Sequence, residues 1–363
     1  MHVPPAPVRR TCFAVSLSFS LLAITATSVV AQSPAMIRFQ HGGQTRQGLL
    51  LLKSAKDAFV LARDGWLHEI PHASTVVTAD SGGSFEPLSA VQLRQRLRQE
   101  YGRGYEVLST QNFLVIQPAG RGDYWPKLFE DSYRGFKQYV GRRGVDLRSG
   151  SFPMVAIVMP DESAMYRELK RHDIDVRRVA GIYDPHSNRI ITHDGDRRDF
   201  TRATVRHEAA HQSAFNLGVH SRINDTPRWI TEGLGQMFEP AAMTDARVGT
   251  TVALRINQDS LKRIRQKWND FGRLSEAMQR LVADDTMFDS PRDVDDAYAL
   301  SWSMLFFLAE RDPSRFAKIL THTSKRPPFQ TYTRVERQKD FARIVSDSTP
   351  KFAREVRRFL DRY

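Results

Sequence analysis

Two histidines four residues apart, His207 and His211, stand in the run RHEAAHQSAFNLG, and Glu208 follows the first of them directly. In a helix each residue advances by about 100°, so the two histidines share one face and their rings can converge on one ion. Glu208 is rotated by about 100° from His207, which places it beside such an ion rather than among equal ligands. This spacing is typical of zinc sites in which two histidines bind the metal and the glutamate acts as a base.

A short motif of this kind also occurs by chance, and the alternative is an ordinary helix face with solvated histidines. A second stretch, TPRWITEGLGQMFEP, favours the metal site. Its Thr226 and Pro227 are typical of a helix start, as N-cap and first helical residue. Glu232 lies 21 positions after His211. That distance lets the chain leave the first helix, turn at Gly218 and return beside it, so that the two helices supply His, His and Glu.

Three protein ligands leave a fourth position of the metal open for water, as in catalytic rather than structural zinc sites. Two nitrogens and one oxygen suit zinc best among the common metals, and we expect one zinc ion per chain. Thiolate ligands are excluded in the body of the chain, because its only cysteine, Cys12, stands near the N-terminus.

The sequence HEAAH followed by WITEG resembles the gluzincin branch of the thermolysin-like metallopeptidase clan, in which the third ligand is a Glu on a following helix. The longer match HEAAHQ…PRWITEGLGQMFE is similar to a bacterial peptidase-like family known as a domain of unknown function. The resemblance covers about residues 110–345, with its specific motifs at 206–239. The metzincin pattern does not apply, because its third histidine would fall on Leu217.

The resemblance implies a zincin-like α+β fold with His207, His211 and Glu232 as the zinc ligands. It also implies that Glu208 takes a proton from the water that the metal activates and passes it to the leaving amine. The reaction would be hydrolysis of a peptide bond in a peptide or protein substrate, without a covalent intermediate. An alternative function is a catalytically silent zinc-binding scaffold of the cell envelope.

The oxyanion of a tetrahedral intermediate needs a hydrogen-bond donor. In gluzincin aminopeptidases a Tyr on a later helix does this, which makes Tyr298 the candidate here. The alternative for Tyr298 is a place in the core, and Tyr183 and His193 are further candidates. Gln236, one turn after Glu232, stands where thermolysin-like enzymes often have Asp, so the residue that orients the ligand histidines stays open.

In the same clan, substrate pairs as an added strand along the edge of the sheet. NRIITHD, residues 188–194, is the run that we nominate for this edge, with an ordinary sheet strand as the equal alternative. His172 and His220 stand among polar residues, and we expect both at the surface.

Short apolar or alternating runs between turn signals predict a small β-rich module at about 36–80, and SGGS at 81–84 predicts a linker. The chain then mixes helix and strand patterns, with NRIITHD among the strands, and is almost entirely helical from Asp199 onward. A mixed sheet followed by a helical half is an α+β arrangement. Helices are expected at about 124–140, 200–217, 227–239, 259–267, 273–282, 293–310, 312–321, 338–346 and 350–362.

Residues 1–31 have the features of a signal peptide that is cut after Ala31, with Arg9 and Arg10 before a largely apolar stretch. An uncleaved membrane anchor is the alternative. We therefore expect a periplasmic or secreted protein that is not an integral membrane protein. The expected organisation is a signal peptide at 1–31, the β-rich module with its linker at 32–84, and a gluzincin-like metallopeptidase domain with a helical C-terminal half at 85–363.

The formal net charge of the 363-residue chain is +12. Such an excess suggests affinity for an anionic partner, such as an envelope polymer, although a basic solvated surface is the simpler interpretation. No nucleic-acid-binding motif is recognisable, and we expect no nucleic-acid partner. The sequence does not distinguish endopeptidase from aminopeptidase action, and it leaves open the peptide sequence that is cut, the role of the β-rich module, the oligomeric state and any autoinhibition.

Overall fold

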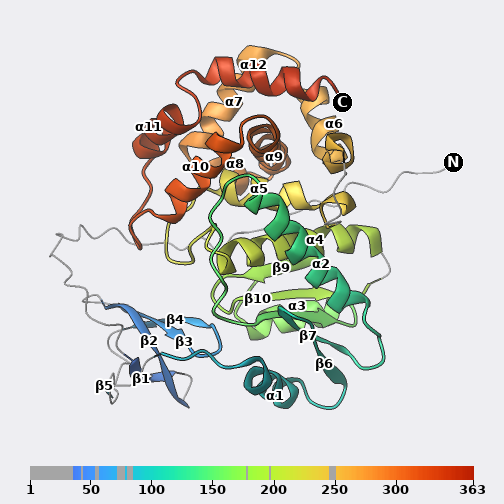
Figure 1. Ribbon diagram of the computed structural model, residues 1–363, viewed down its shortest axis with the longest axis vertical. Helices are drawn as coiled ribbons and strands as arrows, with labels where there is room; N and C mark the ends of the chain where they lie inside the picture. Colours follow the sequence, from blue (N-terminus) through green and yellow to red (C-terminus); the bar gives the residue numbers. More distant parts are fainter. Residues whose placement is uncertain are drawn as a thin grey trace.

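The computed structural model describes residues 36–41, 44–53, 57–71, 78–79, 85–176, 179–195, 198–244 and 251–363. The expected signal peptide and the expected linker lie outside these residues. The fold is a mixed α+β arrangement with an N-terminal antiparallel sheet, a second mixed sheet and a helical C-terminal half (Figure 1). The α+β class and the N-terminal β module are therefore confirmed.

The N-terminal sheet is an antiparallel arrangement in the order β4-β3-β2-β1-β5. Alternate residues face a small apolar core, in which Ile37, Phe39, Val60 and Ile70 are all buried. Its strands are β1 (Met36–His41), β2 (Gln44–Lys53), β3 (Asp57–Ala62), β4 (Leu67–Pro71) and β5 (Thr78–Ala79).

This sheet is fixed to the rest of the molecule by backbone and side-chain contacts. The backbone N–H of Leu67 donates to the carbonyl of His186 at 2.7 Å. The guanidinium of Arg222 donates to the carbonyls of Gly65 and His186, which joins the two parts. Trp66 stacks on His172, and the side chain of His172 is only 4% exposed. Our expectation of a surface position for His172 is therefore wrong, because the N-terminal sheet covers it.

The second sheet has the order β6-β7-β8-β10-β9, with parallel pairing of β7 to β8 and of β8 to β10 and antiparallel pairing at both edges. Its strands are β6 (Tyr105–Ser109), β7 (Phe113–Pro118), β8 (Met154–Met159), β9 (Gly181–Asp184) and β10 (Arg189–His193).

The run 188–194 that we nominated for the sheet edge is not at the edge, because β10 lies between β8 and β9. The tight turn between Asp184 and Arg189 folds β9 back antiparallel along the outer side of β10. The edge strand on this side of the sheet is therefore β9, the GIYD run, and the nomination is corrected to it.

Helices cover both faces of this sheet (Figure 1). Alternate residues of the strands face opposite ways: Leu114 and Ile116 pack toward α1 (Ala90–Tyr101) and α3 (Glu162–Arg171). Phe113 and Val115 pack on the other face, toward α2 (Tyr124–Gly141) and α4 (Arg198–Asn216). Because strand residues alternate in direction, this apolar run is buried on both sides, as expected for parallel central strands.

The helical half is built around α9, which is buried along almost its whole length and contacts α5, α6, α7, α8, α10 and α12. A helix that is apolar on nearly all sides is expected in a protein core, and α9 lies there. The described helices include none long and apolar enough to cross a membrane. The helices are α5 (Arg228–Phe238), α6 (Gln258–Lys267), α7 (Phe271–Ala283), α8 (Thr286–Asp289), α9 (Val294–Arg311), α10 (Pro313–Ser324), α11 (Arg334–Ile344) and α12 (Thr349–Leu360). The nine helices that we expected coincide, within a few residues at their ends, with nine of the ten described helices formed by α2 and α4 to α12, and the single turn α8 is the one of these ten without a sequence prediction.

Candidate metal centre

Helices α4 and α5 bring His207, His211 and Glu232 together in a buried cluster. The two Nε2 atoms of the histidines lie 3.0 Å apart. The Oε2 atom of Glu232 lies 3.3 Å from the Nε2 of His207 and 3.6 Å from that of His211. Three donor atoms from two helices thus form a small triangle that could hold a metal ion, as the spacing of the motif predicts.

The chemistry of the donor atoms favours a cation at the centre of this triangle. The Nδ1 atom of His207 lies 3.1 Å from Oε1 of Glu239, so we assign the ring proton to Nδ1. Its Nε2 then points a lone pair at the other two donors. The Oε2 atom of Glu232 is buried and makes no hydrogen bond of good geometry within the described part of the chain. Lone pairs that face one another inside a protein repel unless a cation or proton lies between them.

Two glycines allow the helices to approach closely enough to form the cluster. A Cβ atom on Gly235 would lie 2.6 Å from the imidazole of His207, and one on Gly233 would lie 2.6 Å from the carbonyl oxygen of Ser301 on α9. Both distances are too short for carbon contacts, so α5 needs glycine on the side facing α4 and on the side facing α9. Our sequence analysis missed these two residues, although the run EGLGQ in a helical pattern is a signal for them.

Glu239 orients the first histidine, and the sequence analysis missed it as well. Its Oε1 faces Nδ1 of His207 and accepts a hydrogen bond from Gln236 Nε2 at 2.9 Å. Its Oε2 accepts one from Asn257 Nδ2 at 2.9 Å. Glu239 is seven positions after Glu232, close to two helical turns, so both carboxylates project toward α4. The sequence left open which residue orients the ligand histidines. For His207 this residue is Glu239, and Gln236 holds Glu239 in place.

The other end of α4 is tied to the sheet by amide side chains. Gln212 Nε2 donates to the carbonyls of Val155 at 3.1 Å and of Asn188 at 2.7 Å. Asn216 Nδ2 donates to Oδ1 of Asn188 at 2.8 Å. Asn188 adopts a φ of 58°, which an asparagine tolerates better than most residues. These bonds fix the rotation of α4, and with it the direction in which His211 points.

Glu208 lies between the cluster and the free edge of the sheet. It is buried, and its Oε2 accepts a hydrogen bond from the backbone N–H of Tyr183 on β9 at 2.8 Å. Burial raises the pKa of Glu208, while the charges of His207 and His211 and the Tyr183 N–H oppose this, and the net direction is upward. The residue is thus a carboxyl group of increased basicity next to a metal-ligand cluster.

Electrostatics within the cluster are strong in the metal-free protein. Burial alone would lower the pKa of His207, but its close contacts with the carboxylates of Glu232 and Glu239 outweigh burial and raise the pKa to about 10. Burial would raise the pKa of Glu232, yet the nearby His211 and His207 hold it well below its usual range. A proton therefore occupies the metal-free cluster, and a metal ion must displace it to bind.

Of the three candidates for an oxyanion donor, Tyr298 borders the cluster. Its ring centroid lies 6.4 Å from that of His207, and the side chain is buried. Tyr183 donates its hydroxyl to Asn188 at 2.9 Å, so this group is already engaged. His193 has its pKa lowered by burial, and the charges that act on it belong to residues outside the cluster, namely Glu162, Asp161 and Asp194.

His220 is buried, which contradicts our expectation of a surface position. It is 2% exposed, and neither ring nitrogen has a hydrogen-bond partner in the described part of the chain. Burial lowers its pKa to about 3, so the ring is neutral. The turn after α4 folds the chain back, with the N–H of His220 bonded to the carbonyl of Ala214, and packs the ring against Phe215. The polar residues next to His220 in the sequence did not predict that the chain turns back here and buries the ring.

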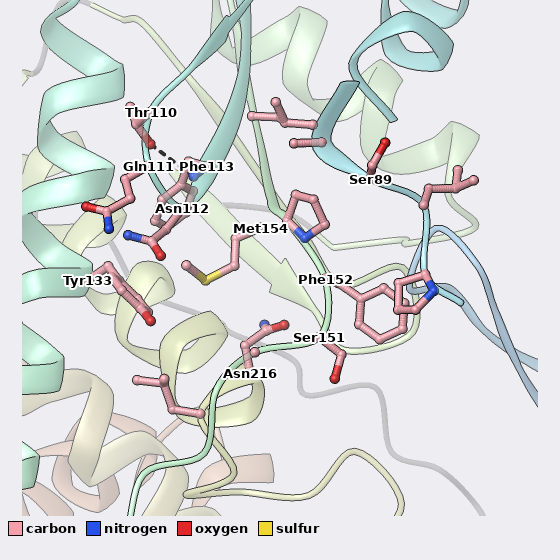
Figure 2. A pocket seen from close by; sticks show the side chains of 17 residues that line it. Ser89, Thr110, Gln111, Asn112, Phe113, Tyr133, Ser151, Phe152, Met154 and Asn216 are labelled. Atoms are coloured by element: carbon pink, nitrogen blue, oxygen red, sulfur yellow. Dashed lines mark hydrogen bonds between the residues drawn. The ribbon is translucent and has the colours of Figure 1, made fainter. Parts of the chain in front are cut away.

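A cavity of about 430 Å³ lies away from the cluster, between the start of α1 and the loops before β7 and β8 (Figure 2). Figure 2 shows amide and hydroxyl groups around it, including those of Asn112, Tyr133 and Asn216. The residues that line it include no Asp, Glu, His, Lys or Arg. The cavity therefore offers no group for general acid–base chemistry at neutral pH, and the cluster on α4 and α5 is the candidate site.

Residues 201–330 match the model of a family described as "Protein of unknown function (DUF1570)". The matched stretch contains the three cluster residues, Glu208 and Tyr298. No curated protein matches the chain. The comparison thus joins the candidate site to a family whose description assigns no activity.

Proposed function

We propose that this protein is a zinc-dependent metallopeptidase with a gluzincin-like catalytic domain. The observation that carries the proposal is the inward-facing triangle of His207, His211 and Glu232 with Glu208 beside it. A tetrahedral zinc ion with bonds of about 2.0–2.2 Å requires donor atoms about 3.3–3.6 Å apart. Two of the observed separations, 3.3 and 3.6 Å, fall within this range, and the 3.0 Å between the two Nε2 atoms is about 0.3 Å short of it. Two imidazoles and a carboxylate are also a donor set that zinc prefers.

The role proposed for each residue follows from its contacts. Zinc, when bound, supplies activation of water and polarisation of a carbonyl group. Glu208 accepts a proton at its carboxylate, which the Tyr183 N–H holds in position, and then delivers that proton to the leaving nitrogen. Glu239 keeps the tautomer of His207 that can act as a ligand. Tyr298, at the border of the cluster, donates to the oxyanion.

The free edge of β9 is the proposed site of substrate pairing. No strand of the described sheet lies outside β9, and the N–H of Tyr183 is directed toward Glu208 rather than toward β10. A peptide in extended conformation would add as a further strand at this edge, with one of its bonds held near Glu208. An edge strand beside the metal helix, with the third ligand on the following helix, supports a zincin-like fold. Export of the protein remains a proposal that rests on residues 1–31.

A zinc-binding scaffold without catalysis is the second candidate, and the burial of the cluster favours it. His207, His211 and Glu232 are each less than one tenth exposed, as is usual for a structural metal site. The scaffold interpretation needs the metal but gives Glu208 no chemical role. The two functions therefore differ in the consequence of altering Glu208 alone.

The test compares metal content and peptide cleavage in four proteins: wild type, Glu208→Gln, Glu232→Gln and the exposed control Glu276→Gln on α7. We expect about one zinc ion per chain in wild type, in the control and in Glu208→Gln, and a much weaker site in Glu232→Gln. Cleavage of a peptide library should fall by about 10²–10⁴-fold in Glu208→Gln, because the base is lost while its shape is kept.

The outcomes separate the candidates. Zinc binding without cleavage by wild type would favour the scaffold. Cleavage by Glu208→Gln at the wild-type rate would show that the assigned base is wrong. Absence of zinc from folded, reconstituted wild type would overturn both candidates.

A further inference from the structure

A second feature lies in the C-terminal half, far along the chain from the metal cluster. A hollow of about 890 Å³ opens between α10, α11 and the turn at Gly144. We call it the basic hollow, because no acidic residue lines it. Its charged or titratable lining residues are Arg315, Lys318, His322, Lys325, Arg326 and Arg343.

Three of the cations form a stripe along α10 and its end. Arg315, Lys318 and Lys325 stand at positions i, i+3 and i+10, which places them within about 80° on one helix face. The stripe is about 15 Å long, since each residue adds about 1.5 Å. Lys318 and Lys325 are exposed, and no carboxylate of the described residues lies within 4 Å of either ammonium group. Their charges are therefore available to an incoming anion.

The deeper cation, Arg326, is fixed but incompletely neutralised. Its side chain is 9% exposed and stacks over the ring of Tyr332, with the guanidinium carbon 3.6 Å from the ring centroid. Its Nε is buried without a hydrogen-bond partner in the described part of the chain. The nearest carboxylate oxygens are 3.6 Å away on Glu336 and 4.0 Å away on Asp340.

Asp340 is also shared among several partners. Its Oδ1 accepts from Arg343 at 2.8 Å, and its Oδ2 lies 2.8 Å from Nε2 of His322. The hydroxyl of Tyr332 donates to Oδ2 at 2.8 Å as well. Arg315 is paired with Asp312 at 3.2 Å, so three carboxylates, those of Asp312, Glu336 and Asp340, face the five Lys and Arg side chains, and the hollow keeps an excess of positive charge.

We propose that the basic hollow binds an elongated, phosphate-rich polyanion. Guanidinium and ammonium groups together suit phosphate oxygens, the first by paired hydrogen bonds and the second as a point charge. A single phosphate cannot reach all the cations of a stripe about 15 Å long, so a ligand with several charged groups is required. The hydroxyl of Thr321, which also lines the hollow, adds a neutral hydrogen-bonding group. This site is separate from the metal cluster and does not depend on peptidase activity.

The protein offers a matched control for the test. Lys351 and Arg358 are exposed on α12 and stand seven positions apart, as do Lys318 on α10 and Lys325 directly after its last residue. The double variant K318E/K325E and the control K351E/R358E change the net charge by the same amount. Binding of short-chain polyphosphate to wild type and both variants would be measured by calorimetry at two salt concentrations. Inorganic orthophosphate and phosphatidylglycerol vesicles are the comparison probes, and circular dichroism checks that each variant is folded.

We expect polyphosphate to bind wild type, to bind more weakly at higher salt, and to bind the folded K318E/K325E variant on the order of tenfold or more weakly. The control should stay within about twofold of wild type. Equal weakening in the control would overturn the proposal, because general charge attraction would then explain the binding. Orthophosphate binding as tight as polyphosphate binding would refute an elongated ligand, and binding of vesicles without binding of polyphosphate would assign the hollow to a lipid surface instead.

Discussion

Replacement of Gly235 by alanine tests whether the close approach of α5 to α4 positions the metal cluster. The added Cβ would lie 2.6 Å from Cε1 and Nε2 of His207, whereas ordinary contacts begin at 3.4 Å. The ring or the helix must therefore move by roughly 0.8 Å, the difference between these two distances. Because Nδ1 of His207 is held by Glu239, the ring cannot swing away without losing that hydrogen bond.

The size of this shift sets the expected effects on metal binding and on stability. Metal–ligand distances tolerate deviations of about 0.2 Å, so a shift several times larger should remove His207 as an effective ligand. We expect the zinc affinity to fall by about 100-fold or more, at the upper end of what altered ligand orientation costs. Overpacking costs about 1–3 kcal/mol, and the higher helix propensity of alanine returns up to about 1 kcal/mol. The metal-free protein should therefore lose about 0–3 kcal/mol of its free energy of unfolding.

The assay pairs zinc competition against a chromogenic chelator with urea unfolding of the chelator-treated protein. Gly233→Ala is the first control, since its Cβ would meet the carbonyl of Ser301 and leave His207 untouched. Gly233→Ala should destabilise the fold. Its effect on zinc binding should be smaller than that of Gly235→Ala. Gly141→Ala is the second control, because its nearest contact, Leu147, is at an ordinary 3.5 Å. Wild-type zinc affinity in folded Gly235→Ala would refute the reasoning.

Two further predictions concern the same cluster. Glu239→Gln should weaken zinc binding by about 10–100-fold, because the carboxylate that orients Nδ1 of His207 is lost. The same chelator competition would measure the zinc affinity. An unchanged affinity would show that Glu239 has no orienting role. The apparent zinc affinity should also rise by about tenfold per pH unit between roughly pH 7 and 9. The pKa of His207 is raised to about 10 in the metal-free protein, so zinc must displace a proton from His207 throughout this range. Competition titrations at several pH values check the slope, and a flat profile would show that the metal-free cluster holds no such proton.

Much of the cluster could be predicted from the sequence because its geometry is local. A spacing of four residues in a helix places His207 and His211 on one face whatever the rest of the chain does. The length of chain between the two motifs allowed Glu232 to return to that face. The helices of the C-terminal half were predicted for the same reason, since their apolar residues repeat with the helical period.

The residues whose positions we predicted wrongly have a common reason for the error. NRIITHD was nominated for the sheet edge, but every alternating strand looks alike until its neighbours are known, and β9 covers it. His172 and His220 have polar neighbours in sequence, yet Trp66 and Phe215 cover them in the fold. Contacts between residues distant in the chain leave no trace in local composition.

The sequence by itself determined the donor set, the α+β class and the candidate base, because helix period and residue chemistry are properties of short stretches. Only the tertiary structure decided which groups support them. Glu239 orients His207, and Gly235 makes room for its ring, because α4 and α5 pack closely together here. The direction in which two helices face each other depends on the packing of the whole core, including α9 behind them, and no local pattern encodes it.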